Sequence, residues 1–267
     1  MAEENGSKNM NAVTRSILVL LFTALLVGTS LFFLVKSPRA LSARVPFVGC
    51  EAEGQAGYIP APGGESKVFP ITERSAERLA YYKAESGRGV LAPRGWYCFL
   101  IYGSNGGTLY VAPEEIVSDD LFSATWSGLS GPAIEVVTEF GGTSGRFAVA
   151  RTIARVFPAH KEFAEGVIKD FLVPAGNFPF DPYPEDTLIY RSNEMVEYQT
   201  PANSDGLGTS FGLKKNASPI SGVAILVNET IDDKPTDSFD LIQVAIRLPS
   251  NLSDLTGVIL QQIERNE

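Results

Sequence analysis

The chain has 267 residues, of which 44% are hydrophobic and 10% aromatic; this composition is typical of a folding chain and excludes an intrinsically disordered one. Its formal net charge is −9, and no concentrated basic stripe interrupts the acidic character. Because an acidic surface repels phosphate backbones, nucleic acid is excluded as a partner.

The first predicted element is an apolar run without charge or proline, from Ser16 to Val35. A helix of this length rises about 30 Å, which matches the hydrocarbon core of a bilayer. A cleaved signal has a shorter apolar core of about 7–15 residues, and it ends at small residues. This run ends at Lys36. We therefore predict a retained transmembrane signal anchor at residues 16–35 after a cytoplasmic tail at 1–15; cleavage after Ala43 is the alternative.

The orientation of this anchor does not follow from its flanking charges. Lys8 and Arg15 precede the run, and Lys36, Arg39 and Arg44 follow it. Because the two sides carry nearly equal positive charge, the positive-inside rule does not determine which side faces the cytoplasm. A short tail, one span and a large domain are usual for proteins whose domain lies outside the cytoplasm. We expect a periplasmic or extracellular domain, with the reversed orientation as the alternative.

Residues 36–66 are rich in Gly and Pro and are predicted to form a tether and an irregular domain start, followed by the main domain at 67–267. Cys50 and Cys98 are the only cysteines. In an oxidising compartment they would pair, and closing a loop of this size would stabilise the fold by about 4 kcal/mol. Two buried thiols in a reduced compartment are the alternative.

The first part of the domain contains three predicted elements. Residues 68–71 favour a short strand, and Thr72 is a good N-cap for a helix that ends near Gly87. Residues 96–111 are rich in aromatic and β-branched side chains on both sides of Asn105-Gly106. This pattern predicts a β-hairpin.

The second part alternates helices with pairs of strands. We predict strands at 133–140, 187–191, 195–200, 222–228 and 241–248, helices at 146–157, 160–171 and 252–264, and a proline-rich loop at 173–186. Because the strands come mostly in adjacent pairs, the sequence predicts an α+β fold: a single globular domain with a largely antiparallel sheet and about four helices, preceded by one transmembrane helix.

Few residues offer catalytic chemistry. His160 is the only histidine, so a multi-histidine metal site is impossible and a Ser-His-Asp triad would have to use this residue. Asp181, Glu185 and Asp186 are candidates for a carboxylate-based hydrolytic site. The sequence predicts no cofactor and no metal site.

One turn is a candidate anion site: Thr143, Ser144, Gly145 and Arg146 lie between a predicted strand and a predicted helix. Unpaired N–H groups at a helix start attract anions, and Arg146 would add positive charge. The alternative is a glycine turn with a side-chain cap and solvated arginines.

The absence of a recognisable catalytic motif favours a non-catalytic binding or interaction module of the cell envelope, anchored in the membrane through Ser16 to Val35. Its expected partner is an envelope protein or an anionic ligand. The alternative is a membrane-tethered envelope hydrolase with a carboxylate-based or unorthodox active site.

Overall fold

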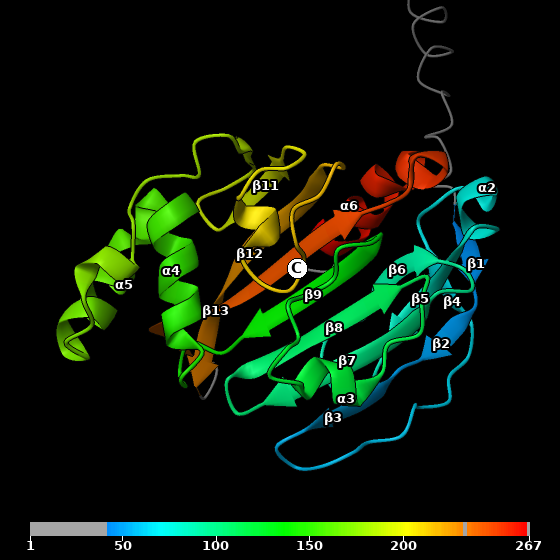
Figure 1. Ribbon diagram of the computed structural model, residues 1–267, viewed down its shortest axis with the longest axis horizontal. Helices are drawn as coiled ribbons and strands as arrows, with labels where there is room; N and C mark the ends of the chain where they lie inside the picture. Colours follow the sequence, from blue (N-terminus) through cyan, green and yellow to red (C-terminus); the bar gives the residue numbers. More distant parts are fainter. Residues whose placement is uncertain (1–41, 232–233, 266–267) are drawn as a thin grey trace, which may run out of the picture. The chain divides into compact units, whose positions relative to one another are not determined.

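The apolar segments pair into an eight-stranded sheet in the computed structural model, which describes residues 42–231 and 234–265 (Figure 1). The strand order is β10-β11-β12-β13-β9-β8-β7-β3, and every neighbouring pair is antiparallel except β3 with β7. The bounds are β3 Glu51–Gly54, β7 Tyr97–Gly103, β8 Gly106–Ala112, β9 Ala133–Glu139, β10 Thr187–Tyr190, β11 Met195–Thr200, β12 Ile220–Ile231 and β13 Lys234–Arg247.

Two smaller sheets and five α-helices complete the described fold. One small sheet pairs β1 with β4, and the other has the order β2-β5-β6. Their bounds are β1 Ala43–Val45, β4 Lys67–Phe69, β2 Phe47–Gly49, β5 Leu79–Lys83 and β6 Val90–Pro93. The helices are α2 Glu73–Ala76, α3 Ser118–Phe122, α4 Arg146–Val156, α5 Lys161–Asp170 and α6 Thr256–Glu264. The predicted α+β class with a largely antiparallel sheet is confirmed.

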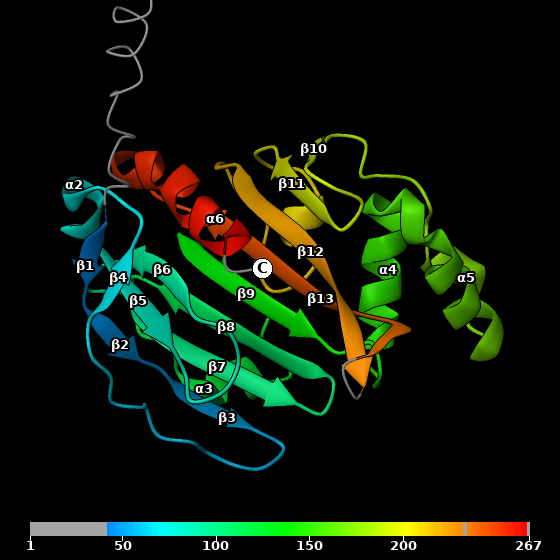
Figure 2. The same cartoon turned by 180° about the vertical axis from the view of Figure 1, so that it is seen from behind.

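Side chains alternate across the large sheet, so it has two different faces. Ile134 and Val136 of β9 point to the face that α6 and the β2-β5-β6 sheet cover, which we call the α6 face (Figure 2). Glu135 lies between them in β9 and therefore points to the opposite face. Figure 1 shows that α3 and α4 lie on that face. This second face is called the α4 face.

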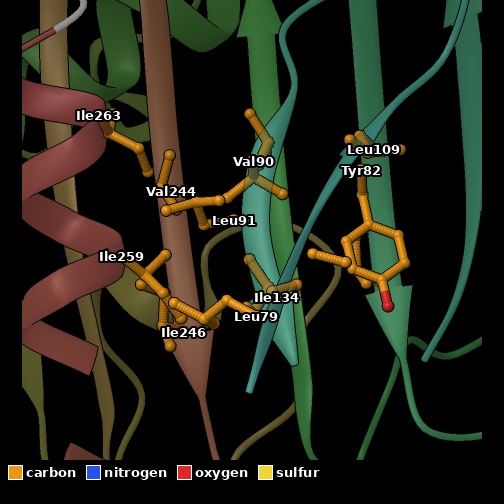
Figure 3. Close-up of a cluster of buried hydrophobic side chains, with 14 of the residues drawn as sticks. Leu79, Tyr82, Val90, Leu91, Leu109, Ile134, Val244, Ile246, Ile259 and Ile263 are labelled. Atoms are coloured by element: carbon orange, nitrogen blue, oxygen red, sulfur yellow. The ribbon is translucent and has the colours of Figure 1, made fainter. Parts of the chain in front are cut away.

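The main apolar core fills the α6 face. Figure 3 shows Ile259 and Ile263 of α6 beside Val244 and Ile246 of β13, with Leu79 and Leu91 of the small sheet next to them. All six side chains are buried. The small sheet and α6 are therefore held on the large sheet by hydrophobic packing, which fixes the segments around the candidate site.

Most predicted elements are confirmed. The hairpin joins β7 to β8 through Ser104 and Asn105, and the positive φ angle falls on Gly106, at 142°. α4 and α5 begin and end within one residue of the predicted bounds. The strand pairs β10–β11 and β12–β13 also form, with β12 and β13 longer than expected.

The helix predicted from Thr72 to near Gly87 is wrong beyond its first turn. Thr72 does cap a helix, because its hydroxyl accepts the Ser75 N–H at 3.1 Å, but α2 ends at Ala76. Leu79–Lys83 is a strand instead. Leu79, Ala80 and Tyr82 are buried while β5 pairs with β2 and β6, so sheet pairing and burial override the helical spacing.

Two other segments differ from expectation. Strands β1, β2 and β3 lie within the 36–66 range, where an irregular start is predicted; with three or four residues each, they are too short to show alternation. The predicted helix 252–264 begins as a 3-10 helix over Ser250–Leu255 and becomes α-helical at Thr256.

Cys50 and Cys98 form a disulfide across 48 residues of sequence. The bond joins the chain between β2 and β3 to β7. The cysteine pairing is therefore confirmed. The predicted anchor at 16–35 lies outside the described residues, and within the described ones no helix is long and apolar enough to cross a membrane.

Candidate functional site

A cavity of about 380 Å³ opens on the α6 face between the small sheets and the large one. Strands β4 and β5, the β5–β6 loop and the last turns of α6 surround it. Its lining consists of Lys67, Val68, Phe69, Tyr81, Lys83, Gly87, Arg88, Gly89, Val136, Ile242, Val244, Gln262 and Ile263. We call it the basic cavity because of its charged side chains.

Three cations line this cavity, which is unexpected in a chain of net charge −9. They are Lys67, Lys83 and Arg88, and among the described residues no Asp or Glu lines it. The Lys83 ammonium donates to the Gly87 carbonyl oxygen at 2.8 Å, which ties β5 to the following loop. The cavity therefore gathers positive charge against the sign of the whole chain.

Tyr81 forms an aromatic platform within the cavity. Its ring lies 5.2 Å from that of Phe69 and 6.3 Å from that of Phe47, measured between centroids. The Lys67 ammonium lies 4.7 Å from the Tyr81 centroid. A Cβ atom at Gly89 would lie 2.5 Å from the Tyr81 hydroxyl oxygen, so only glycine lets the loop approach the ring this closely.

The protonation states at this platform follow from burial. Burial raises the pKa of Tyr81, so its phenol stays neutral. Burial also lowers the pKa of Arg88, and the nearby Tyr81 opposes this change. A guanidinium keeps its proton in proteins, so Arg88 remains cationic. The cavity is thus lined by cationic side chains beside a neutral ring.

The floor of the basic cavity is apolar. It is built from Val136 of β9, Ile242 and Val244 of β13, and Ile263 of α6. A second cavity of about 220 Å³ adjoins it and shares Gly87, Arg88 and Val136. The second cavity continues over β8 and β7 and is lined mainly by Leu100, Tyr102, Leu109, Thr138 and Phe140.

A separate polar cluster lies on the α4 face. Glu135 is 1% exposed, and its carboxylate accepts the Gly212 N–H at 2.6 Å, the Leu213 N–H and the Tyr110 hydroxyl. Burial raises the pKa of Glu135 to about 7, although these three donors and Lys214 lower it.

Arg247 completes this cluster. It is 2% exposed, and its guanidinium donates to the carbonyl oxygens of Leu129 at 2.7 Å and Gly131 at 2.8 Å, and also to that of Lys214. Glu135 and Arg247 thus hold two loops on the sheet through backbone groups. Because these buried groups are satisfied by the protein itself, the cluster supports the fold.

The predicted anion site is a turn that leads directly into α4 and includes its first residue, Arg146. The Thr143 hydroxyl donates to the Phe140 carbonyl oxygen at 2.8 Å, and Gly145 is the N-cap. The Arg146 guanidinium donates to the carbonyl oxygens of Gly142, at 2.8 Å, and Thr143, and lies 4.9 Å from the Phe171 ring centroid. The structure thus gathers Thr143, Ser144, Gly145 and Arg146, while anion binding there stays a prediction.

A carboxylate already lies beside this turn. A Cβ atom at Gly145 would come within 2.8 Å of a Glu139 carboxylate oxygen. Burial raises the pKa of Glu139 to about 7, while the Asn105 amide, which donates to it at 3.1 Å, lowers it. When ionised, Glu139 would compete with an incoming anion for the first turn of α4.

Two of the three acids considered for hydrolysis have structural partners, while the main-chain carbonyl oxygen of the third, Asp181, accepts a hydrogen bond from Arg155 at 2.7 Å. Asp186 accepts the Leu207 N–H at 2.7 Å and the Thr200 hydroxyl at 2.8 Å, and Glu185 accepts the Ser204 hydroxyl. His160 lies 3.3 Å from the Glu194 carboxylate, and its ring centroid lies 4.7 Å from that of Phe239 in a tilted arrangement. Within the described residues, no three His, Cys, Asp or Glu side chains gather as metal ligands.

The sequence analysis did not identify the residues of the basic cavity. Lys67 lies in a short strand, Lys83 at the end of another strand and Arg88 in a loop. Only the fold brings them together. Glu135 and Arg247 did carry a signal: each is a charge with an apolar residue on either side in a predicted strand, a pattern that favours a buried, paired group. Comparison of the chain with protein-family models, curated proteins and solved structures finds no match.

Proposed function

We propose that this chain is a membrane-anchored, extracytoplasmic binding module of the cell envelope, and that its ligand is an anionic molecule held in the basic cavity. The observation that carries the proposal is the set of three cations, without a lining acid among the described residues, around an aromatic platform and an apolar floor. Ligand sites are typically concave and mostly apolar, with a few placed polar groups.

Two further observations support the cellular placement. The apolar run from Ser16 to Val35 has the length of a membrane span. The Cys50–Cys98 disulfide favours an oxidising compartment, because cytoplasmic thiols are usually kept reduced.

The binding module is favoured over a carboxylate-based hydrolase. A hydrolase of that kind needs two carboxyl groups facing a substrate across a cleft. Glu135 and Asp186 instead accept backbone N–H groups from the loops that cover them. Their contacts explain their burial without a substrate.

Lysine protection tests the proposal on the full chain. The protein would be reconstituted in phosphatidylcholine vesicles, treated with an amine-acetylating reagent with and without anilinonaphthalene sulfonate, and digested for mass spectrometry. We expect this anionic probe to slow acetylation of Lys67 and Lys83. Lys169, exposed on α5, is the internal control. Equal labelling of Lys67 and Lys83 with and without the probe would overturn the proposal.

A further inference from the structure

A separate cavity of about 330 Å³ lies beside α4. Arg151 and Arg155 line it, and no Asp or Glu of the described residues does, so we call it the arginine cavity. We infer that it binds a small organic phosphate monoester, whose phosphate group is held by Arg151 and Asn177. The inference does not depend on the proposed function, because the arginine cavity and the basic cavity have no lining residue in common.

One wall of the arginine cavity is a single face of α4. Ala148, Arg151, Thr152 and Arg155 line the cavity, and they follow one another at intervals of three, one and three residues. Residues three and four positions apart are neighbours on a helix surface. The helix therefore brings two guanidinium groups and one hydroxyl group to the same space.

The opposite wall includes a glycine-rich loop that is fixed to the strands below it. The Asp186 carboxylate accepts the Leu207 N–H at 2.7 Å, and the Thr200 hydroxyl accepts the Gly208 N–H at 3.0 Å. A Cβ atom at Gly208 would lie 2.7 Å from a methyl carbon of Ile220, so glycine is needed for this close approach. The wall is thus held in place without a ligand.

Arg155 contributes a positive charge at a fixed position. Its guanidinium donates to the Asp181 carbonyl oxygen at 2.7 Å and lies 4.3 Å from the centroid of the Tyr183 ring. Neither contact carries a negative charge that would neutralise it. Asp186 acts on Arg155 electrostatically, but its carboxylate oxygens accept the Leu207 N–H and the Thr200 hydroxyl.

Other polar groups of the cavity make no hydrogen bond through their side chains. Within the described residues this applies to Arg151 and Asn177, which are both exposed, and to Thr152, which is 4% exposed. Glu139 interacts with Arg151 electrostatically, but no ion pair joins them within the described part of the chain, and Glu139 accepts the Asn105 amide instead. Donors are therefore available for a ligand.

These donors suit a phosphate monoester better than a carboxylate. A phosphate monoester carries a charge between about −1.5 and −2 at pH 7 and has three strong acceptor oxygens, which match two guanidinium groups and an amide. A carboxylate offers one charge and two oxygens. The volume of about 330 Å³ lies within the roughly 300–1,000 Å³ of small-molecule sites, so an organic group fits beside the phosphate, next to the half-buried ring of Phe211.

The first experiment compares three probes that share one ring. The full chain in phosphatidylcholine vesicles would be treated with phenylglyoxal, which modifies arginine, in the presence of phenyl phosphate, benzoate or phenol, and then digested for mass spectrometry. We expect phenyl phosphate to protect Arg151 at a concentration at least about tenfold lower than benzoate, and phenol to give no protection. Arg74, exposed on α2, is the internal control and should be modified equally in all samples.

The second experiment removes one donor and keeps Arg151 as the reporter. Asn177→Ala is expected to raise the phenyl phosphate concentration for half protection about tenfold, because a hydrogen bond to a charged group is lost. Asn193→Ala is the matched control, since Asn193 is also exposed and lies in the turn between β10 and β11. Lys67→Gln changes the basic cavity alone and should leave the protection of Arg151 unaltered.

The outcomes separate this inference from the proposed function. Equal protection of Arg151 by benzoate and phenyl phosphate would overturn the phosphate ligand. Equal protection of Arg74 and Arg151, or an equal effect of Asn177→Ala and Asn193→Ala, would overturn the arginine cavity as the site. Absence of any protection by phenyl phosphate would also overturn it, and protection of Lys67 by anilinonaphthalene sulfonate would then still support the proposed function. The three probes are compared on the wild-type protein, so they decide even if a variant does not fold.

Discussion

Lys67 and Tyr81 meet in the basic cavity, with the ammonium nitrogen 4.7 Å from the ring centroid. The two residues come from β4 and β5, which belong to different small sheets. A cation over an aromatic face is attracted by the ring quadrupole and keeps its remaining N–H donors available. This pair therefore places a positive charge in the basic cavity without neutralising it.

Removal of this charge should weaken ligand binding more than it weakens the fold. Lys67→Gln is expected to reduce the affinity for anilinonaphthalene sulfonate about tenfold, because a hydrogen bond to a charged group contributes roughly 1.5–3 kcal/mol. The free energy of unfolding should fall by less than about 1 kcal/mol, the value of an exposed cation–π contact. Protection of Lys83 from acetylation measures the first effect and urea unfolding the second.

Lys169→Gln is the matched control for this prediction, because it removes the same charge from an exposed position on α5. A tenfold loss in both variants would indicate a general electrostatic effect and contradict a specific role for Lys67.

The buried Glu135 predicts an unusual pH dependence of stability. Burial raises the pKa of Glu135 in the folded state to about 7, from an unfolded value near 4.5. Between these values the folded state binds more protons than the unfolded state, so the free energy of unfolding falls as pH rises. The full effect is about 3 kcal/mol between pH 4.5 and pH 7. Glu139 acts in the same direction.

Urea titrations of the wild type and of Glu135→Gln at about pH 5 and pH 8, followed by tryptophan fluorescence, would measure this effect. Trp126 is a local reporter because its ring centroid lies 5.7 Å from that of Tyr110, a partner of Glu135. We expect the wild type to lose more stability than Glu135→Gln as pH rises. An equal pH dependence in the two proteins would show that Glu135 does not titrate as described.

Gly212 has no room for a side chain. A Cβ atom there would lie 2.4 Å from the Tyr110 hydroxyl oxygen and 2.5 Å from a Glu135 carboxylate oxygen. Gly212→Ala is therefore expected to lower the free energy of unfolding by about 1–3 kcal/mol through overpacking. At Gly176 a Cβ atom meets nothing within 4 Å, so Gly176→Ala should stay within about 0.5 kcal/mol of the wild type. Similar urea midpoints for the two variants would refute the close packing at Gly212.

The disulfide should make a large contribution to stability. Cys50 and Cys98 are 48 residues apart, and the chain-entropy relation gives about 4 kcal/mol for a loop of this size. Addition of a thiol reductant should lower the urea midpoint of the wild type and leave that of the Cys50→Ala, Cys98→Ala double variant unchanged. A wild-type midpoint that is insensitive to complete reduction, checked by alkylation, would contradict this contribution.

The elements of the large sheet could be predicted because their signals are local. The hairpin of β7 and β8 is indicated by Asn105-Gly106, and α4 by its apolar stripe. The fold class follows from the order of such elements. Strand β5 could not be predicted in this way. Its identity depends on pairing with β2 and β6, which come from other parts of the sequence.

The candidate site was harder to predict than the fold. Lys67, Lys83 and Arg88 have no shared motif or regular spacing, and Val136 and Val244 resemble any buried strand residues. The cavity exists only because β4, β5 and α6 pack on the large sheet. The predicted turn at Thr143 to Arg146 has a recognisable local pattern, but the sequence does not show that Arg146 donates to backbone carbonyl groups there.

The most direct test of the central claim is a calorimetric titration of anilinonaphthalene sulfonate into the full chain in phosphatidylcholine nanodiscs, with empty nanodiscs subtracted. The wild type is compared with the Lys67→Gln, Arg88→Gln double variant and with Lys169→Gln. The basic cavity predicts saturable binding to the wild type and to Lys169→Gln, and at least about a tenfold loss of affinity in the double variant. Equal affinity of all three proteins, or no binding to the wild type, would contradict it.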